Sequence, residues 1–335
     1  MQRASANPMT QTKRGFAAGA ILAVAIAFTP YLAVATDNTF DRTFTVSGPN
    51  TRIELDNPSG SVDIHVGKDG QVHIHAKVAP GGWSLFGNGE KSVQEILANP
   101  PLEQRGDTIR IGKNSTYLKN VSIDYQIEVP KDTHLDAGLA SGGLTANKLR
   151  GPVTVSTASG YTHIYEIERE VQVTAASGAV EIRGVGGYVR VSSASGSIEI
   201  ADVKGDIKAN AASGSIRVDR PADRVDLSSV SGSIRITGAD NDVKARVISG
   251  PINVSGNPSS NRYWELKTVS GSVDIQVPRS ASFLLSAEAT SGDIRTSIPV
   301  IIEEQNKHSL RAHVGSSSGR VEVHTVSGEI QVNGT

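Results

Sequence analysis

Short runs in which apolar and polar residues alternate recur along most of the chain. Apolar side chains, mostly Val and Ile, occupy the second and fourth positions after a glycine or a similar turn residue. Examples are Val180 and Ile182, Val189 and Val191, and Ile198 and Ile200. A period of two with β-branched residues on one face is typical of β-strands buried on that face. The pattern predicts an all-β protein built from short strands.

The Ser-Gly pairs that precede many of these runs recur every 18 residues. Their glycines are Gly142, Gly160, Gly178, Gly196, Gly214, Gly232 and Gly250. Halfway between them stand Gly151, Arg169, Gly187, Gly205, Asp223 and Asn241, mostly residue types that tolerate positive φ, so we expect a second corner there. A unit of two short strands and two corners is too small to bury its own apolar face, so such units must stack. The sequence therefore predicts a parallel β-solenoid (β-helix) with 18-residue coils.

Regular solenoid repeats are expected over residues 136–335. The spacing loosens after Gly250, and the later glycines Gly271, Gly292 and Gly319 leave room for loops at 257–262, 278–282 and 300–308. Residues 36–135 form a less regular N-terminal β region, with strands expected at 40–46, 52–56, 62–66 and 72–77. Within it, residues 80–105 open with Pro80-Gly81-Gly82 and continue as a short helix over 90–98. A solenoid must cover its first exposed edge, so we interpret this insertion as a cap.

The first 35 residues have the features of a cleavable secretory signal. Lys13 and Arg14 precede an apolar run over 16–28, and Ala33-Val34-Ala35 supplies small residues for cleavage. The alternative is a retained anchor helix, because the apolar stretch over 15–35 approaches the ~20 residues that span a bilayer. Pro30 favours cleavage. We expect an exported mature chain without a transmembrane segment, either periplasmic or secreted to the cell surface.

Composition removes several classes of chemistry and partner. The chain has no cysteine, which excludes disulfides, thiolate zinc sites and a cysteine nucleophile. Its 33 Lys and Arg against 34 Asp and Glu give no broad basic surface, so nucleic acid is not an expected partner. We expect no cofactor.

One group of residues resembles a metal site. If residues 67–71 form a turn between the strands at 62–66 and 72–77, then Asp63, His65, His73 and His75 share the polar face of a hairpin. Imidazole and carboxylate are normal ligands for zinc and copper. The alternative is that these histidines are simply exposed on a polar face.

Ligand-binding candidates come from two other places. Trp83 and Phe86 lie in the Gly-rich insertion and form either a partner-touching tip or part of the cap. Outward positions of successive coils align Arg190 with Lys208 on one wall and Arg217 with Arg235 on the other. Each wall is interpreted either as an ordinary solvated surface or as a polar docking face. The serines at the corners satisfy backbone groups in turns or, alternatively, form a binding row.

A family resemblance adds to this picture. The segment over 121–131, the run Leu139-Ala140-Ser141-Gly142-Gly143-Leu144 and the repeated Ser-Gly-x-Ile/Val-x-Ile/Val resemble the bacterial putative adhesin family, a β-strand-repeat domain of unknown function. The similarity covers about residues 40–335. It implies an extracytoplasmic repeat scaffold with adhesion inferred for the family, and it supplies no catalytic or ligand residues.

Three functions remain open. The first is an exported, non-enzymatic scaffold with adhesin-like binding of a cell-envelope or surface ligand, which is a polysaccharide or a protein. The second is an envelope stress or regulatory component that partners a membrane sensor. The third is a carbohydrate-active enzyme, which needs paired carboxylates or clustered acids that the outward columns do not offer. The sequence does not decide the oligomeric state.

Overall fold

The computed structural model describes residues 38–335 except 49, 82–87, 114–117, 119–120 and 317. These residues belong to one compact unit, Asp37–Thr335. The signal peptide predicted for residues 1–35 lies outside the described residues.

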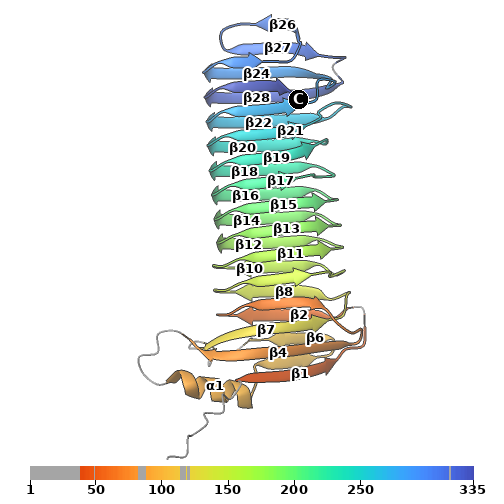
Figure 1. Cartoon of the computed structure of the whole chain (residues 1–335), viewed down its shortest axis with the longest axis vertical. Helices are drawn as coiled ribbons and strands as arrows, with labels where there is room; N and C mark the ends of the chain where they lie inside the picture. Colours follow the sequence, from red (N-terminus) through yellow and green to blue (C-terminus); the bar gives the residue numbers. More distant parts are fainter. Residues whose placement is uncertain (1–37, 49, 82–87, 114–117, 119–120, 317) are drawn as a thin grey trace, which may run out of the picture. The chain divides into compact units, whose positions relative to one another are not determined.

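In the part of the chain that the structure describes, whose strands alone are counted below, two long β-sheets face each other and enclose a single apolar core (Figure 1). Sheet A has 14 strands, in the spatial order β1 (Thr39–Thr45), β4 (Gln71–Pro80), β7 (Val121–Val129), β3 (Val62–Val66), β9 (Leu144–Asn147), β11 (Thr162–Ile167), β13 (Val180–Val185), β15 (Ile198–Val203), β17 (Ile216–Asp219), β19 (Ile234–Ala239), β21 (Ile252–Gly256), β23 (Val273–Val277), β29 (Ile330–Gly334) and β25 (Ile294–Thr296). Sheet B has 15 strands, in the order β26 (Ile301–Gln305), β27 (Ser309–Val314), β24 (Phe283–Ser291), β28 (Gly319–Ser327), β22 (Tyr263–Ser270), β20 (Val243–Ser249), β18 (Val225–Ser231), β16 (Ile207–Ser213), β14 (Val189–Ser195), β12 (Val171–Ser177), β10 (Val153–Thr157), β8 (His134–Leu139), β2 (Arg52–Asn57), β6 (Thr108–Ile111) and β5 (Leu102–Arg105).

The predicted β-solenoid is confirmed. Between β8 and β21 each coil contributes one strand to sheet B and the next to sheet A, and each strand pairs in parallel with the strand 18 residues away, as Val171 with Val189 and Val189 with Ile207. The predicted inward positions are buried; Ile198 is 0% and Ile200 is 1% exposed. Outward residues align in columns along each sheet, as polar positions with a period of two require.

The Ser-Gly corners need glycine for two reasons. Gly196 has φ of 134°, and a Cβ on it would lie 1.9 Å from the carbonyl oxygen of Gly178 on the preceding coil. The same positive φ recurs at Gly160, Gly178 and Gly214. Stacked corners therefore pack backbone against backbone, which leaves no room for a side chain.

The second corner differs from the prediction. Positive φ occurs three residues earlier than expected, at Lys148, Glu166, Gly184, Asp202, Arg220 and Gly238. The sheet A strand bends at this residue so that the following apolar side chain, such as Val185 or Val203, returns to the core. At the predicted positions, glycine allows two backbone segments to approach closely, since a Cβ on Gly151 would lie 2.1 Å from the carbonyl oxygen of Thr133.

At both ends of the stack, the order of the strands in space differs from their order in the chain. At one end β2 pairs with both β6 and β8, and β3 pairs with both β7 and β9. At the other end β28 lies between β22 and β24, and β29 lies between β23 and β25. One coil is thus inserted between two others at each end, and neither insertion was predicted.

Toward the ends of the stack most strands pair antiparallel. These pairs are β1 with β4, β4 with β7, β5 with β6, β24 with β27 and β26 with β27. β25, the last strand of sheet A, instead pairs in parallel with β29. The loops expected at 257–262 and 278–282 are present, whereas the one expected at 300–308 is mostly the hairpin of β26 and β27. Helix α1 (Asn88–Ala98), close to the predicted 90–98, packs against β4 and β7 and buries Val93 and Ile96. In the described part of the chain, no helix has the length and apolar character needed to cross a bilayer.

Candidate binding groove

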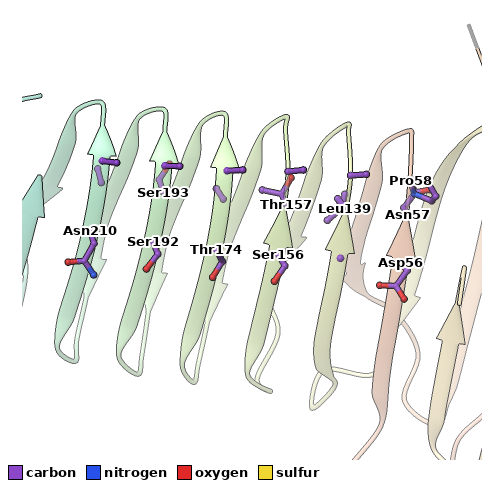
Figure 2. Close-up of a pocket in the computed structure, with 18 of the residues that line it drawn as sticks. Asp56, Asn57, Pro58, Leu139, Ser156, Thr157, Thr174, Ser192, Ser193 and Asn210 are labelled. Atoms are coloured by element: carbon purple, nitrogen blue, oxygen red, sulfur yellow. The ribbon is translucent and has the colours of Figure 1, made fainter. Parts of the chain in front are cut away.

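A long, open groove runs along the outer face of sheet B, with a volume of about 1410 Å³. It crosses successive coils from β2 to β18, so it is built by the repeat itself. Figure 2 shows how Asp56, Ser156, Thr174, Ser192 and Asn210 occupy equivalent places on neighbouring strands. The groove is lined mainly by apolar surface, although one of its rows consists mostly of small polar side chains.

The groove exists because two outward rows of sheet B carry small side chains. The first row is Gly138, Ser156, Thr174, Ser192, Asn210 and Ser228, aligned by the strand register. The second row stands two residues further along each strand and contains Ala140, Ala158, Ala176, Ala194 and Ala212. Larger side chains in these rows would fill the space, so the small residues fix its depth.

The second row changes abruptly beyond Ala212. Its next members, in spatial order, are Val230, Ile248, Val269 and Val326. They are 50%, 52%, 48% and 50% exposed, which is high for branched apolar side chains. We call these four residues the apolar ridge. The groove therefore ends where the ridge begins, at Val230, which lines both.

The first row changes one rung later. After Ser228 it continues with Arg246, Lys267, His324 and Glu288. Glu265, only 8% exposed, lies among these charges with its carboxylate 3.1 Å from Lys244 Nζ and 3.4 Å from Arg246 Nη2, and it accepts a hydrogen bond from Lys267 Nζ at 2.5 Å. Both rows are therefore small along one half of sheet B and large along the other.

Two predicted ligand residues border the groove. Arg190 and Lys208 are neighbours in the β14–β16 register and stand on the same outward face as Ser192 and Asn210. The Arg190 guanidinium lies 5.5 Å from the ring centre of Tyr188, whose hydroxyl accepts a hydrogen bond from Gln172 Nε2 at 3.0 Å. With Asp206, Arg224 and Asp226 they line a hollow of about 320 Å³. This side of the groove carries mixed charge with exposed cations.

The other predicted ligand residues lie elsewhere. Arg217 and Arg235 are neighbours in the β17–β19 register of sheet A, on the opposite wall, and Arg217 Nη1 is 3.8 Å from Glu199. They therefore cannot share a ligand with the groove. Trp83 and Phe86 lie outside the described residues.

The predicted metal cluster is not assembled. β3 and β4 do not form a hairpin, because β7 lies between them and pairs with both. His65 lies 3.7 Å from Glu128 of β7, whereas His73 and His75 lie 3.6 Å and 2.9 Å from Asp41 of β1, and Asp63 aligns with Gln126. Among the residues that the structure describes, no group of three or more His, Cys, Asp or Glu side chains is placed to hold a metal ion. The expectation of a hairpin was wrong because a strand nearly sixty residues later occupies the middle position.

Corner serines behave partly as expected for turn residues. Ser141 Oγ donates to the carbonyl oxygen of Pro58 at 3.2 Å, and Ser159 Oγ donates to that of Ala140 at 3.4 Å. Each bond joins a corner to the preceding coil, so these hydroxyls satisfy backbone acceptors.

Sequence reasoning missed the groove rows themselves. From the sequence, the serines at the corners are predicted to satisfy backbone groups or to form a binding row, and the alanines beside them carry no predicted role in binding. The signal that marks a surface feature is the change of size within a single outward column, from Ser192 and Asn210 to Arg246 and Lys267. A crowded corner would require small residues in every coil, so the change is not explained by crowding alone.

Chemically, the groove is suited to contact rather than to proton transfer. Among the described residues that line the groove, Asp56, at one end, is the one titratable side chain. Glycoside hydrolysis needs two carboxyl groups facing each other across the substrate. The lining offers hydroxyls, methyl groups and one long open path.

Comparison with known families identifies the repeat. The model of the Toastrack family, a domain of unknown function termed DUF4097, matches residues 50–333. The chain belongs to the Toastrack DUF4097 family. This match confirms the resemblance predicted from the Ser-Gly repeat, and nearly all described strands of this Toastrack chain fall within it.

Solved and curated proteins add little to the Toastrack assignment. The chain is similar to the crystal structure of a putative cell adhesion protein from Clostridium sporogenes, at 8% identity and a TM-score of 0.18, over 89% of this chain and 100% of that one. With so low a TM-score, the likeness carries no conclusion for this chain. No curated protein matches it.

Proposed function

We propose that this Toastrack protein is an exported, non-enzymatic scaffold with adhesin-like binding of a cell-envelope or surface ligand through the groove on sheet B. The observation that carries the proposal is the groove itself, an open path along successive coils with one repeated lining. A surface that repeats at every rung, about 4.8 Å apart, suits an extended ligand better than a compact one. The ligand is a polysaccharide or a protein, and the protein is periplasmic or at the cell surface.

Three features of the lining support binding over catalysis. The alanine row offers methyl groups for apolar contact, and the row from Ser156 to Asn210 offers hydroxyl and amide groups for hydrogen bonds. Arg190 and Lys208 border it and would attract acidic groups on a ligand. The described lining residues include no facing pair of carboxylates. Concave, mainly apolar surfaces with a few convergent polar groups are the usual form of binding sites.

A direct test uses the full chain in a binding screen against envelope extracts and purified envelope glycans. Ala176→Trp places an indole in the groove and should weaken binding at least ~10-fold, because the contact surface is blocked. Ala179→Trp is the matched control, since Ala179 is also exposed but lies beyond the Gly178 corner, on the side of β13. It should change affinity less than ~2-fold.

The proposal is wrong if both tryptophan variants bind as the wild type does. It is also wrong if the wild type alters a glycan substrate on prolonged incubation, since the function would then be enzymatic. A circular dichroism spectrum of each variant confirms that the coils remain folded.

A further inference from the structure

The outer face of sheet B has two halves of opposite relief. Along the half from β10 to β16 the second outward row is Ala158, Ala176, Ala194 and Ala212, which leaves the groove. Along the half from β18 to β28 the same row forms the apolar ridge. Four hollow rungs are thus followed by four raised rungs, with the same spacing because both belong to one stack.

The ridge is a surface that needs a partner. Four branched apolar side chains, each about half exposed, stand on adjacent rungs in a single line. Isolated exposed apolar residues are common, whereas a contiguous line of them marks an interaction surface. The partner must present a depression with the same rung spacing, and the groove of this chain is one.

We infer that the groove of one copy receives the apolar ridge of a second copy, in an antiparallel dimer around a two-fold axis. This inference rests on the proposed function, because it names the protein ligand of the same groove. The axis lies in the interface, perpendicular to the stack, between the rungs of Ala212 and Val230. A two-fold interface is self-complementary, so each copy supplies one groove and one ridge.

This axis fixes the register of the contact. Val230 faces Ala212 of the second copy, Ile248 faces Ala194, Val269 faces Ala176 and Val326 faces Ala158. Every raised position meets a hollow one, and the match holds without adjustment because rungs repeat at ~4.8 Å in both copies. A parallel arrangement of two copies would place ridge against ridge and groove against groove.

The neighbouring rows agree with the same axis. In the first row, Arg246 faces Ser192, Lys267 faces Thr174 and His324 faces Ser156, so long side chains again meet short ones. Closest to the axis, Lys208 faces Asp226 of the second copy, which gives two pairs of opposite charge. Arg190 faces Lys244, which is a pair of like charge; Glu265, 3.1 Å from Lys244 Nζ and shared with Arg246 and Lys267, offsets part of this repulsion.

The size of the contact is adequate for a dimer. Eight rungs from Ala158 to Val326 span about 34 Å, and a seven-residue strand such as Val189–Ser195 spans about 23 Å. The face is therefore roughly 780 Å² per copy, close to the ~800 Å² that stable interfaces bury per partner.

Sedimentation equilibrium of the full chain tests the association. Ile248→Ser removes a ridge side chain and Ala194→Trp fills the facing hollow, and each should weaken dimerisation at least ~10-fold, because every dimer contains the altered contact twice. Ile301→Ser and Ala179→Trp are the matched controls, since Ile301 is 71% exposed on β26, outside the eight rungs. Both should dimerise as the wild type does.

Mixing the two defective variants tests the register. In a mixed dimer, the intact ridge of the Ala194→Trp chain enters the open groove of the Ile248→Ser chain, and the added indole faces the shortened side chain. The mixture should therefore associate more tightly than either variant alone. A mixture that stays as dissociated as its components overturns the inference.

Thiol cross-linking locates the axis, because the chain has no cysteine of its own. Single substitutions by Cys at Ser159, Ser177, Ser195, Ser213, Ser231 and Ser249 place one thiol per copy at exposed corners of successive rungs. Identical residues lie about 4.8 Å apart along the stack for Ser213 and Ser231, about 14 Å for Ser195 and Ser249, and about 34 Å for Ser159. With a spacer of about 12 Å, the yield should peak at Ser213 and Ser231 and vanish at Ser159. A yield that does not decrease away from this axis overturns the inference.

The two proposals fail in different ways. A chain that remains monomeric at every concentration, yet binds envelope material less well after Ala176→Trp, overturns the dimer and retains the proposed function. A dimer whose strength is unchanged by Ile248→Ser and Ala194→Trp uses another surface, which also overturns the dimer inference. If the ridge and groove variants weaken association together, the inference is supported whether or not glycans bind.

Discussion

The regular coils between Gly142 and Gly250 and the coils at the two ends of the stack are joined to their neighbours in different ways. In the regular coils each strand pairs with the strands 18 residues before and after it, so neighbours in space are neighbours in sequence. At the ends β2 lies between β6 and β8, and β28 lies between β22 and β24, so coils that follow one another in the chain are separated by a third coil. Identical coils can be added or removed in the first arrangement, whereas each inserted coil joins two others.

The two arrangements differ in the contacts that stabilise a coil. A regular coil contributes one interface to each neighbour, and stability grows as a sum of such interfaces. An inserted coil pairs on both sides with segments that lie apart in the chain, as β28 does with β22 and β24. The stability of the ends therefore depends on long-range contacts, while the middle remains free to vary in length.

The largest expected effect comes from deleting one coil of each kind. Deleting residues 178–195 removes one regular coil and joins Ser177 to Gly196, so β12 and β16 can pair in the old register, and the melting temperature should fall by only a few degrees, roughly 2–4 °C. Deleting residues 319–335 removes β28 and β29, so β22, β23 and β24 each lose the partner on one side and β25 loses its partner β29. The melting temperature should then fall by roughly 10 °C or more, measured by differential scanning calorimetry. Equal shifts for the two deletions would show that the inserted coil has no special role.

A smaller effect is expected from replacing either of two glycines with positive φ by alanine, and the two replacements should differ in their cost. Gly196→Ala in the regular stack should cost about 3 kcal/mol or more of unfolding free energy, because the new methyl group meets the Gly178 carbonyl oxygen at 1.9 Å and φ is 134°. Gly106→Ala, in the turn between β5 and β6, has φ of 60° and nothing within 4 Å of the new Cβ, so it should cost about 1 kcal/mol. Urea denaturation of both variants measures the difference. The backbone-contact explanation fails if Gly106→Ala costs as much as Gly196→Ala.

The smallest effect is a pH dependence at the β2 end. Glu54 of β2 accepts hydrogen bonds from Lys113 Nζ and from Arg110 Nε of β6, both at 3.0 Å, and these cations hold the pKa of its carboxyl below the ordinary value of 4.5. A carboxyl whose pKa is lowered by folding stabilises the fold above its ordinary pKa and loses that contribution as the pH falls through the folded value. Glu54→Gln should therefore cost up to ~1 kcal/mol at pH 7 and progressively less below about pH 4.5. Glu103→Gln, on exposed β5, is the control and should show a smaller change. A cost for Glu54→Gln that is independent of pH would contradict this origin.

Much of the fold follows from local spacing. The interval between Ser-Gly pairs predicted the coil, and the alternation within each run predicted burial of residues such as Ile198 and Ile200. The adjacency of Arg190 and Lys208 followed from the same 18-residue step. These features depend on residues one coil apart, which a repeat makes visible.

What the sequence did not reveal depends on long-range choices. β3 is followed in the chain by β4, but β7 lies between them, because several Val- and Ile-rich strands compete for each position and spacing does not rank them. The predicted metal cluster failed for that reason. The groove escaped notice because Ala176 and Ser192 are also what a tight corner needs, and only a comparison along the whole column shows that the size changes.

The inserted coil at β28 and β29 has a consequence for how the chain is made. Residues 319–334 are synthesised after β24 to β27. A nascent chain therefore contains β22 and β24 before it contains β28, the strand that lies between them. β24 and β25 must stay unpaired with β28 and β29, or separate from other partners, until residues 319–334 have been synthesised. Closure of this end of the stack is therefore a late step, set by the order of synthesis.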